Sequence, residues 1–322
     1  PLLKQCVAGR GHGGCLDMKQ PQPTDAADPT WNAVQFAQQV AQAKVSKDYG
    51  HLKKLFVQVA ESNYKLRDRW RVPRTVAVPH GECAEFRPRG GGVPTVSFST
   101  LSTADALLLL ARDPTRVVCG LNFANGRDIG GGYKNGSTAQ EEDLCRRIPA
   151  LYTSLYRAGK EGLYPFGPCT CSSPERPEGY ADVLYTPDLV LAREGEEEGF
   201  ALLPPAERAR VSLVAAAAPN TKFASDVSDP GLLYRAVRSI FAAPKVVQPE
   251  VTTLVLGAWG CGAFGGNAAE TAGLFAQALV RDNLGQAYRE VHFAIPRTSP
   301  ADANHDAFRE VFRQHRVAVE DL

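Results

Sequence analysis

A run of three glycines comes shortly before a glutamine and two glutamates, in a pattern that suits acid/base chemistry. The residues, with seven others between the two groups, are Gly130, Gly131, Gly132, Gln140, Glu141 and Glu142. Consecutive glycines let the backbone approach a ligand closely, and we expect their amide N–H groups to be free to face an anion or hydroxyls. Two carboxylates at the start of a helix suit cleavage of a glycosidic bond, where a proton must reach the leaving oxygen. The glycine run or the Gln-Glu-Glu group alone would more often be structural, because glutamate in the first turn of a helix is stabilised by the helix dipole and glycine runs are common in loops. Their combination after a buried strand favours a functional site.

A second glycine-rich loop, GAWGCGAFGGN at residues 257–267, follows an apolar strand and precedes a helix. Such a loop can bind a diphosphate, because unpaired amides and the helix dipole point at the anion. Phe264 in this loop could stack on a base or cover a ribose. A lone aromatic residue between glycines is more often an anchor packed on the core, and both interpretations stay open at this point.

The elements that must position these loops alternate between strands and helices. Strands are predicted at 75–78, 96–99, 116–124, 183–192, 211–219, 251–256 and 291–296, and helices at 104–112, 141–158, 230–241, 268–282 and 301–315. Thr103 is the expected cap of the helix at 104–112. The alternation predicts an α/β fold with a mixed central sheet between helices. Both glycine-rich loops follow strands, and ligands in such sheets gather at the carboxyl ends of strands.

The chain divides into three expected parts. Residues 1–28 are rich in Gly, Pro, Gln and Asp and predict a loosely ordered arm that catalysis does not need. Residues 29–95 predict a helical accessory region packed on the core, because apolar residues recur at helical spacing between Trp31 and Trp70. Residues 96–322 form the expected catalytic domain.

Composition narrows the function further. The 322 residues carry 36 Lys and Arg against 35 Asp and Glu, a net charge of +1, which argues against sequence-specific nucleic-acid binding through a broad basic surface. No apolar run approaches the roughly 20 residues of a membrane span. The eight cysteines lack the C-x-x-C spacing of a zinc site, and the C-x-C at Cys169 and Cys171 predicts free thiols. We therefore expect an intracellular protein that has no metal, no cofactor and no membrane partner.

The two motifs together resemble the signature of poly(ADP-ribose) glycohydrolases. NFANGRDIGGGYKNGSTAQEEDL is similar to the family's triple glycine followed by Gln-Glu-Glu, and WGCGAFGG looks like its diphosphate-binding loop. The resemblance covers roughly residues 96–300 and points to the shorter, microbial-type members. Asp128-Ile129 departs from the Asn-Pro that microbial members usually carry there, which affects the turn but leaves the two glutamates in place.

The resemblance implies a macrodomain-like three-layer catalytic domain that hydrolyses ribose–ribose O-glycosidic bonds of poly(ADP-ribose) and releases ADP-ribose from the chain end. Glu142 would be the catalytic acid, and Glu141 and Gln140 would hold ribose hydroxyls. The remaining expected ligand contacts are Asn125, Gly130, Gly131 and Gly132 around the distal ribose, and Gly260, Cys261, Gly262, Ala263, Phe264 and Gly265 around the diphosphate. ADP-ribosylated proteins would be the substrates, the protein would act as a monomer, and its location would be cytoplasmic, or nuclear in a eukaryote.

Two alternatives remain open from the sequence. An ADP-ribose-binding macrodomain without turnover would share the loops, although the Glu141-Glu142 pair argues against it. A dinucleotide-dependent oxidoreductase would need G-x-G-x-x-G in its first strand–helix turn. The string GCGAFG at 260–265 matches that pattern but lies late in the chain, after most of the predicted strands.

Overall fold

The computed structural model describes residues 31–88, 92–222, 226–299 and 301–322, so the predicted arm at 1–28 lies outside the described residues, together with Cys6 and Cys15. The strands are β1 (Val76–Val78), β2 (Thr95–Ser99), β3 (Val118–Ala124), β4 (Val183–Leu191), β5 (Ala209–Ala217), β6 (Thr253–Leu256), β7 (Glu290–Ala294) and β8 (Glu320–Asp321). The α-helices are α1 (Ala33–Val45), α2 (Tyr49–Lys65), α3 (His80–Glu85), α4 (Thr103–Leu110), α5 (Gln140–Arg147), α6 (Leu151–Lys160), α7 (Pro230–Val247), α8 (Ala268–Ala276) and α9 (Asn304–Gln314).

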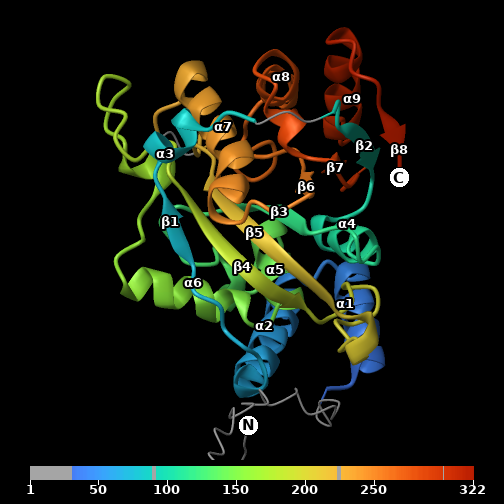
Figure 1. The fold of residues 1–322 in the computed structure, drawn as a ribbon. Coiled ribbons are helices and arrows are strands. Elements are labelled where there is room, and N and C mark those ends of the chain that lie inside the picture. The colour runs from blue at the N-terminus through green and yellow to red at the C-terminus, as the bar shows by residue number, and fades with distance from the viewer. Residues whose placement is uncertain (1–30, 89–91, 223–225, 300) are drawn as a thin grey trace, which may run out of the picture.

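The strands form one mixed sheet in the order β1-β4-β5-β3-β6-β7-β2-β8. β4 runs antiparallel to both β1 and β5, whereas every pair from β5 to β8 along that order is parallel. Parallel neighbours need long crossover connections, which helices usually provide. The predicted α/β class, with a mixed sheet between helices, is confirmed (Figure 1).

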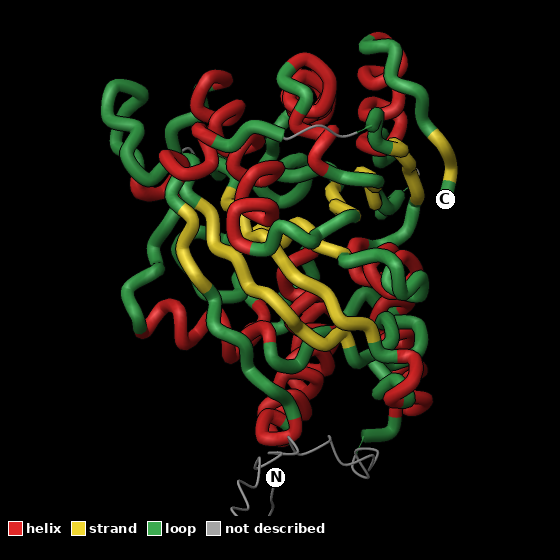
Figure 2. The backbone as a smooth tube through the Cα atoms, in the orientation of Figure 1, coloured by secondary structure: helices red, strands yellow, loops and turns green. Residues whose placement is uncertain are grey.

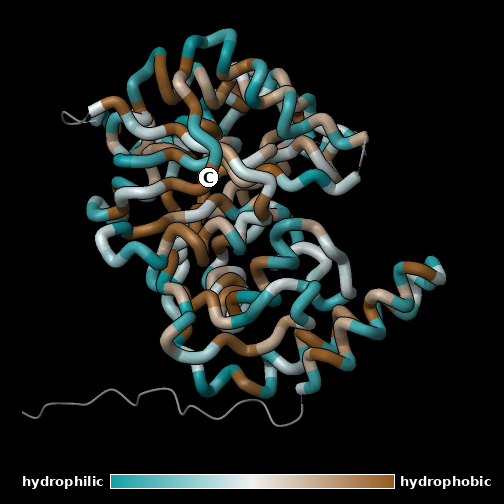
Figure 3. Tube along the Cα trace, turned by 90° about the vertical axis from the view of Figure 1, so that its right-hand side faces the viewer, coloured by the Kyte–Doolittle hydropathy of each residue, from teal (hydrophilic) through white to brown (hydrophobic). Residues whose placement is uncertain are grey.

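Helices cover both faces of the sheet, and each face has its own apolar core. α7, α8 and α9 bury Phe241, Phe275 and Phe308 against one face, and α4 and α5 bury Leu107 and Leu144 against the other. Figure 2 shows the long strands β4 and β5 between these helical layers. Hydrophobic segments concentrate in the centre of the molecule and hydrophilic ones along its outer loops (Figure 3). Within the described ranges, no helix combines the length and the apolar character needed to cross a bilayer.

The N-terminal helices α1 and α2 have a small core of their own. Phe36 from α1, Phe56 from α2 and Phe200 from the β4–β5 connection meet edge to face, with ring centroids 5.9–6.4 Å apart. An aromatic cluster of this kind contributes beyond its buried area. Strand β1, which lies inside the expected accessory region 29–95, pairs with β4. The two long helices of that region therefore end at Lys65, and the chain after them enters the central sheet at β1 before the short helix α3.

The helix predicted over 141–158 is two helices, α5 and α6, with a break between them. Ile148 leaves the helical conformation, with φ −114° and ψ 87°. The following residue is Pro149, and proline disfavours the helical region for the residue before it. The expected cap Thr103 is also wrong: Ser102 caps α4 by accepting a hydrogen bond from the Asp105 amide at 3.1 Å.

Other differences concern where helices end. α7 continues to Val247 through Pro244, six residues beyond the predicted end. α8 ends at Ala276 and gives way to a π-helical turn at Gln277–Arg281, and α9 begins at Asn304, three residues later than predicted. The short elements α3 and β8 were not predicted, because six and two residues give too little periodicity to read.

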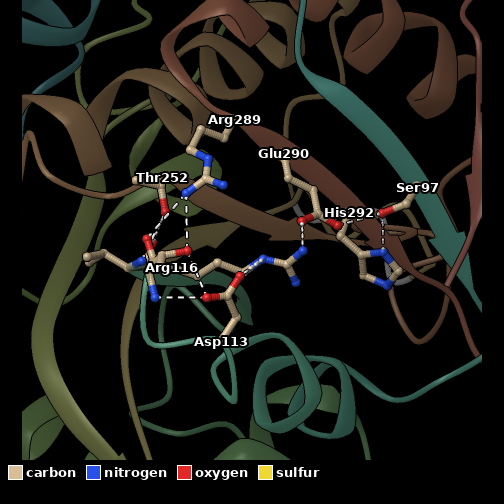
Figure 4. Close-up of polar contacts among 9 residues, drawn as sticks. Ser97, Asp113, Arg116, Thr252, Arg289, Glu290 and His292 are labelled. Atoms are coloured by element: carbon tan, nitrogen blue, oxygen red, sulfur yellow. Dashed lines mark hydrogen bonds and ion pairs between the residues drawn. The ribbon is translucent and has the colours of Figure 1, made fainter.

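A buried polar network joins β2 and β7 away from both glycine-rich loops (Figure 4). The two ring nitrogens of His292 lie 2.8 Å from the Ser97 hydroxyl and 2.9 Å from the Ser99 hydroxyl. The Ser97 hydroxyl also donates to Glu290 at 3.0 Å, and Glu290 forms an ion pair with Arg116 at 3.1 Å. Burial, followed by the nearby Arg116 charge, lowers the pKa of His292 to about 4. His292 is thus a neutral structural residue that links β7 to β2, and Glu290 extends the network to Arg116 in the loop after α4.

Candidate active site

Both glycine-rich loops lie at the carboxyl ends of neighbouring parallel strands. β3 precedes the first loop, β6 precedes the second, and the two strands are paired in the sheet. A cavity of about 490 Å³ opens between the loops, which is within the usual range for small-molecule sites. Of the predicted site residues, those that line it are Asn125, Gly131, Gly132, Gln140, Glu141, Glu142, Gly260, Gly262, Ala263 and Phe264. Gly130, Cys261 and Gly265 belong to the loops but do not line the cavity.

Glycine is required at the middle of this run because the backbone there lies too close to the two glutamates to leave room for a side chain. Gly131 has a left-handed conformation with φ +56°, and a Cβ added there would lie 2.5 Å from the Glu142 Oε1 atom. The Gly132 amide donates to the same Oε1 atom at 2.7 Å, and the Gly131 amide donates to the Asp128 carbonyl at 2.9 Å. The expectation that these amides are free for a ligand is therefore wrong for Gly131 and Gly132. The Gly132 amide instead fixes the carboxylate of Glu142.

Glu142 has one oxygen held by the protein and one that is not. Its Oε1 atom accepts from the Gly132 amide, whereas its Oε2 atom is buried and has no hydrogen-bond partner among the residues that the structure describes. A buried polar atom without a partner is costly, and at a cavity wall a ligand can supply the missing partner. This geometry suits a group that exchanges a proton with a bound substrate.

Glu141 is held at both oxygens. Its Oε1 atom accepts from the Asn122 side chain at 3.1 Å, and its Oε2 atom accepts from the Asn125 amide at 2.8 Å. Burial is the main cause that raises the pKa of Glu141 to about 8; the Glu142 charge adds to it, and the two N–H donors oppose it. Because both oxygens already have N–H partners, Glu141 is less able than Glu142 to pass a proton to a ligand.

Asn122 was missed by the sequence reasoning although it orients Glu141. It lies in β3, is fully buried, and its Oδ1 atom has no partner within the described parts of the chain. An amide side chain inside the otherwise apolar segment VVCGLNFA was the available signal, because buried polar groups are normally paired with a specific partner.

Gln140 holds the start of α5 against the sheet. Its side-chain nitrogen donates to the Leu121 carbonyl at 2.7 Å and to the Thr103 hydroxyl at 3.0 Å, and its oxygen accepts from the Phe123 amide at 2.8 Å. These contacts occupy the side-chain amide. Gln140 therefore connects α5 to β3 and α4. The sequence-based expectation that its amide is free to hold ribose hydroxyls does not fit these contacts.

Asn125 closes the turn that leads into the glycine run. Its Oδ1 atom accepts from the Arg127 amide at 2.9 Å and the Asp128 amide at 3.0 Å, the pattern of an Asx turn. The Asp128-Ile129 pair is accommodated in this turn. Asn125 thus shapes the loop with its side chain and holds Glu141 with its backbone.

The second loop lines the cavity with residues whose backbone amides have no partner in the described chain. Among the described residues, no hydrogen-bond acceptor is found for the amides of Gly262, Ala263 and Phe264. α8 begins directly after the loop, with Asn267 as its cap, so the positive end of the helix dipole lies nearby. Free amides together with a helix start make this loop suited to an anion such as a diphosphate.

The position of Phe264 leaves both interpretations from the sequence open. Its half-buried ring packs against the apolar core that α7, α8 and α9 share, and it also lines the cavity. Its carbonyl accepts from the Thr221 amide and hydroxyl, at 3.0 and 2.8 Å. The ring is thus held in place at the cavity wall, where a flat ligand group can contact it.

The six described cysteines are free thiols, including Cys169 and Cys171. In the part of the chain that the structure describes, no three His, Cys, Asp or Glu side chains come together in a group that could hold a metal ion.

A family model matches the chain. The sequence model of the family described as "Microbial-type PARG, catalytic domain" matches residues 33–194, just over half of the 322-residue chain. No curated protein sequence matches the chain significantly.

Solved structures of poly(ADP-ribose) glycohydrolases (PARGs) are similar over most of the chain. The enzyme from Thermomonospora curvata is 25% identical with a TM-score of 0.68, covering 80% of this chain and 99% of that one. The enzyme from Deinococcus radiodurans, solved in complex with ADP-ribose, is 27% identical with a TM-score of 0.62, covering 74% and 94%. The family match includes α1, α2, the glycine run and both glutamates, and the chain therefore belongs to the microbial-type poly(ADP-ribose) glycohydrolase catalytic domain family.

Proposed function

We propose that this chain hydrolyses the ribose–ribose O-glycosidic bonds of poly(ADP-ribose), with Glu142 as the general acid. Membership of the glycohydrolase family supports the reaction. The observation that carries the assignment of the acid is the Oε2 atom of Glu142, buried without a partner at the wall of a cavity that both glycine-rich loops line.

The reaction follows from this arrangement. Glu142 donates a proton from Oε2 to the departing ribose oxygen while the glycosidic bond breaks and positive charge develops at the anomeric carbon. The carboxylate that remains then takes a proton from the water that attacks this carbon, which restores the acid. The Gly132 amide, 2.7 Å from Oε1, keeps the carboxyl group in place throughout.

Glu141 and the second loop bind the terminal ADP-ribose unit. The Glu141 carboxyl group, oriented by Asn122 and Asn125, accepts hydrogen bonds from ribose hydroxyls. The free amides of Gly262, Ala263 and Phe264 bind the diphosphate, and the Phe264 ring packs against the ligand. We further propose that cleavage takes place at the chain end of the polymer and that ADP-ribosylated proteins are the substrates. The active form in this proposal is a monomer.

Incubating the protein with purified poly(ADP-ribose) and following the products by anion-exchange chromatography tests this proposal. We expect free ADP-ribose to be the first and main product. Short oligomers that accumulate before ADP-ribose would contradict cleavage from the chain end. Calorimetric ADP-ribose binding without any turnover would identify a binding module and refute the enzymatic assignment.

A further inference from the structure

The helix that carries both glutamates is short, and its far end is held by another part of the chain. α5 spans eight residues, and the last four carbonyls of any helix lack partners within it. In α5 the carbonyls of Cys145 and Arg146 accept hydrogen bonds from the Asn63 side chain, at 3.2 and 2.9 Å. Asn63 lies near the end of α2 and is buried. A single side chain of the accessory region therefore serves two of these four carbonyls.

The other two carbonyls have backbone partners. That of Leu144 accepts from the Ile148 amide at 2.8 Å, and that of Arg147 accepts from the amides of Ala192 and Arg193 at 3.0 and 3.2 Å. All four terminal carbonyls of α5 are therefore satisfied. Only the middle two depend on a side chain, so they are the ones that a single substitution can release.

Asn63 also reaches the glycine-rich segment in front of α5. Its side-chain nitrogen also lies 3.1 Å from the Tyr133 hydroxyl, so the two N–H bonds of Asn63 are shared among three acceptors. Tyr133 is buried and directly follows Gly132, whose amide holds Glu142. The backbones meet closely here as well, because a Cβ on Gly136 would lie 2.2 Å from the Lys53 carbonyl of α2. α2 thus contacts both the segment that fixes Glu142 and the helix that carries it.

Arg193 determines which way the Asn63 amide points. Its Nε–H donates to the Asn63 Oδ1 atom at 2.8 Å, and its other nitrogens donate to the Ser62 hydroxyl and the Phe200 carbonyl, both at 2.7 Å. Because guanidinium can only donate, Oδ1 must face Arg193, and the NH₂ group must face α5 and Tyr133. The orientation of Asn63 follows from its partners.

We propose that Asn63 is a positioning residue for the glycosidase reaction: it connects α5 to the glycine-rich segment and so sets where the Glu142 carboxyl group lies in the cavity. Helix α2 then helps to position the catalytic group, in keeping with a family match that includes both accessory helices. This inference rests on the proposed role of Glu142.

The test compares Asn63→Leu and Asn63→Asp with the wild type on poly(ADP-ribose). Leucine has a similar volume and no hydrogen bonds, whereas aspartate keeps the acceptor for Arg193 but puts a carboxylate oxygen, which cannot donate and repels the carbonyls, in place of the NH₂ group. Active sites are counted by calorimetric titration with ADP-ribose, so that unfolded protein does not enter kcat. We expect kcat per site to fall roughly 10- to 100-fold, since a misplacement of about 1 Å costs on that order, while ADP-ribose affinity is retained through the second loop.

Val40→Ala is the matched control. Val40 is buried in the same accessory core as Phe36 and Phe56, on α1 and apart from the Asn63 hydrogen bonds, so its truncation should lower the melting temperature and leave kcat per site unchanged. The proposal is overturned if both Asn63 variants keep wild-type kcat per site, or if Val40→Ala loses as much kcat for the same fall in melting temperature.

Tyr133→Phe keeps the test decisive if the Asn63 variants fail to fold. It removes one hydroxyl and leaves the ring in place, so we expect a smaller loss of kcat, again with unchanged ADP-ribose affinity. Unchanged kcat in that variant would contradict the connection to the glycine-rich segment. Absence of turnover in the wild type would instead refute the proposed function, so the two failures are distinguishable.

Discussion

Replacing Gly131 by alanine should displace the Glu142 carboxyl group without touching the second glycine-rich loop. The added Cβ would lie 2.5 Å from Glu142 Oε1 and 3.2 Å from Glu141 Oε2. The first distance is shorter than real Cβ contacts allow, and the second is tight. Since Glu141 is held at both oxygens by N–H donors, Glu142 is the side chain that must move.

The size of the effect follows from these distances. Relieving the contact to an ordinary separation of about 3.4 Å requires a shift on the order of 1 Å, and such a misplacement costs roughly 10²-fold in rate. The left-handed φ of +56° at Gly131 adds a backbone cost of about 1–2 kcal/mol for alanine. We therefore expect a large loss of kcat together with a modest loss of stability.

The assay measures turnover of poly(ADP-ribose), calorimetric affinity for ADP-ribose, and the melting temperature. Gly273→Ala is the matched control, because Gly273 lies in α8 and a Cβ there meets nothing within 4 Å. That change should leave turnover intact and stabilise the protein by about 0.5–1 kcal/mol. A Gly131→Ala protein with wild-type kcat would show that the glycine does not control Glu142.

Three further predictions concern the same cavity. Glu141→Gln should remove a pH dependence of stability, because burial raises the pKa of Glu141 in the folded wild type to about 8. The protonated Glu141 side chain therefore contributes fully to the free energy of unfolding below about pH 4.5, and this contribution is lost as pH rises through 8. The melting temperature of the variant should therefore gain on the wild type between pH 5 and about 8.5, and parallel curves would refute this. Asn122→Leu should lower kcat by releasing Glu141, measured at saturating polymer, and an unchanged value would remove Asn122 from the site. Phe264→Ala should weaken ADP-ribose binding by about 1–3 kcal/mol, as loss of an aromatic stack does, and equal calorimetric affinities would make Phe264 a packing residue alone.

The sequence predicted the sheet and the two loops well, because both depend on local patterns. The strand at Val118–Ala124 is apolar apart from Asn122, and the glycines that follow it indicate a loop. The positions of Glu141 and Glu142 in the first turn of a helix were equally visible. What the pattern could not show was the break at Ile148, since a proline inside an amphipathic stretch can either kink a helix or end it.

Contacts between distant segments were beyond the reach of the sequence. Gln140 was expected to face the ligand, but its partners Thr103 and Leu121 are brought to it only by the fold. The same holds for Asn63, which is separated from Arg146 by 83 residues. Side-chain polarity identified these residues as capable of hydrogen bonding, and only the three-dimensional structure identified their partners.

The central claim is tested most directly by Glu142→Gln, measured for turnover of poly(ADP-ribose) and for ADP-ribose affinity in the same preparation. The amide is nearly isosteric and can keep the hydrogen bond from Gly132, but it cannot deliver a proton. If Glu142 is the acid, kcat should fall by at least about 10²-fold, while ADP-ribose affinity stays at the wild-type value because we propose that the diphosphate binds to the other loop. A Glu142→Gln protein that turns over the polymer at the wild-type rate would contradict the assignment.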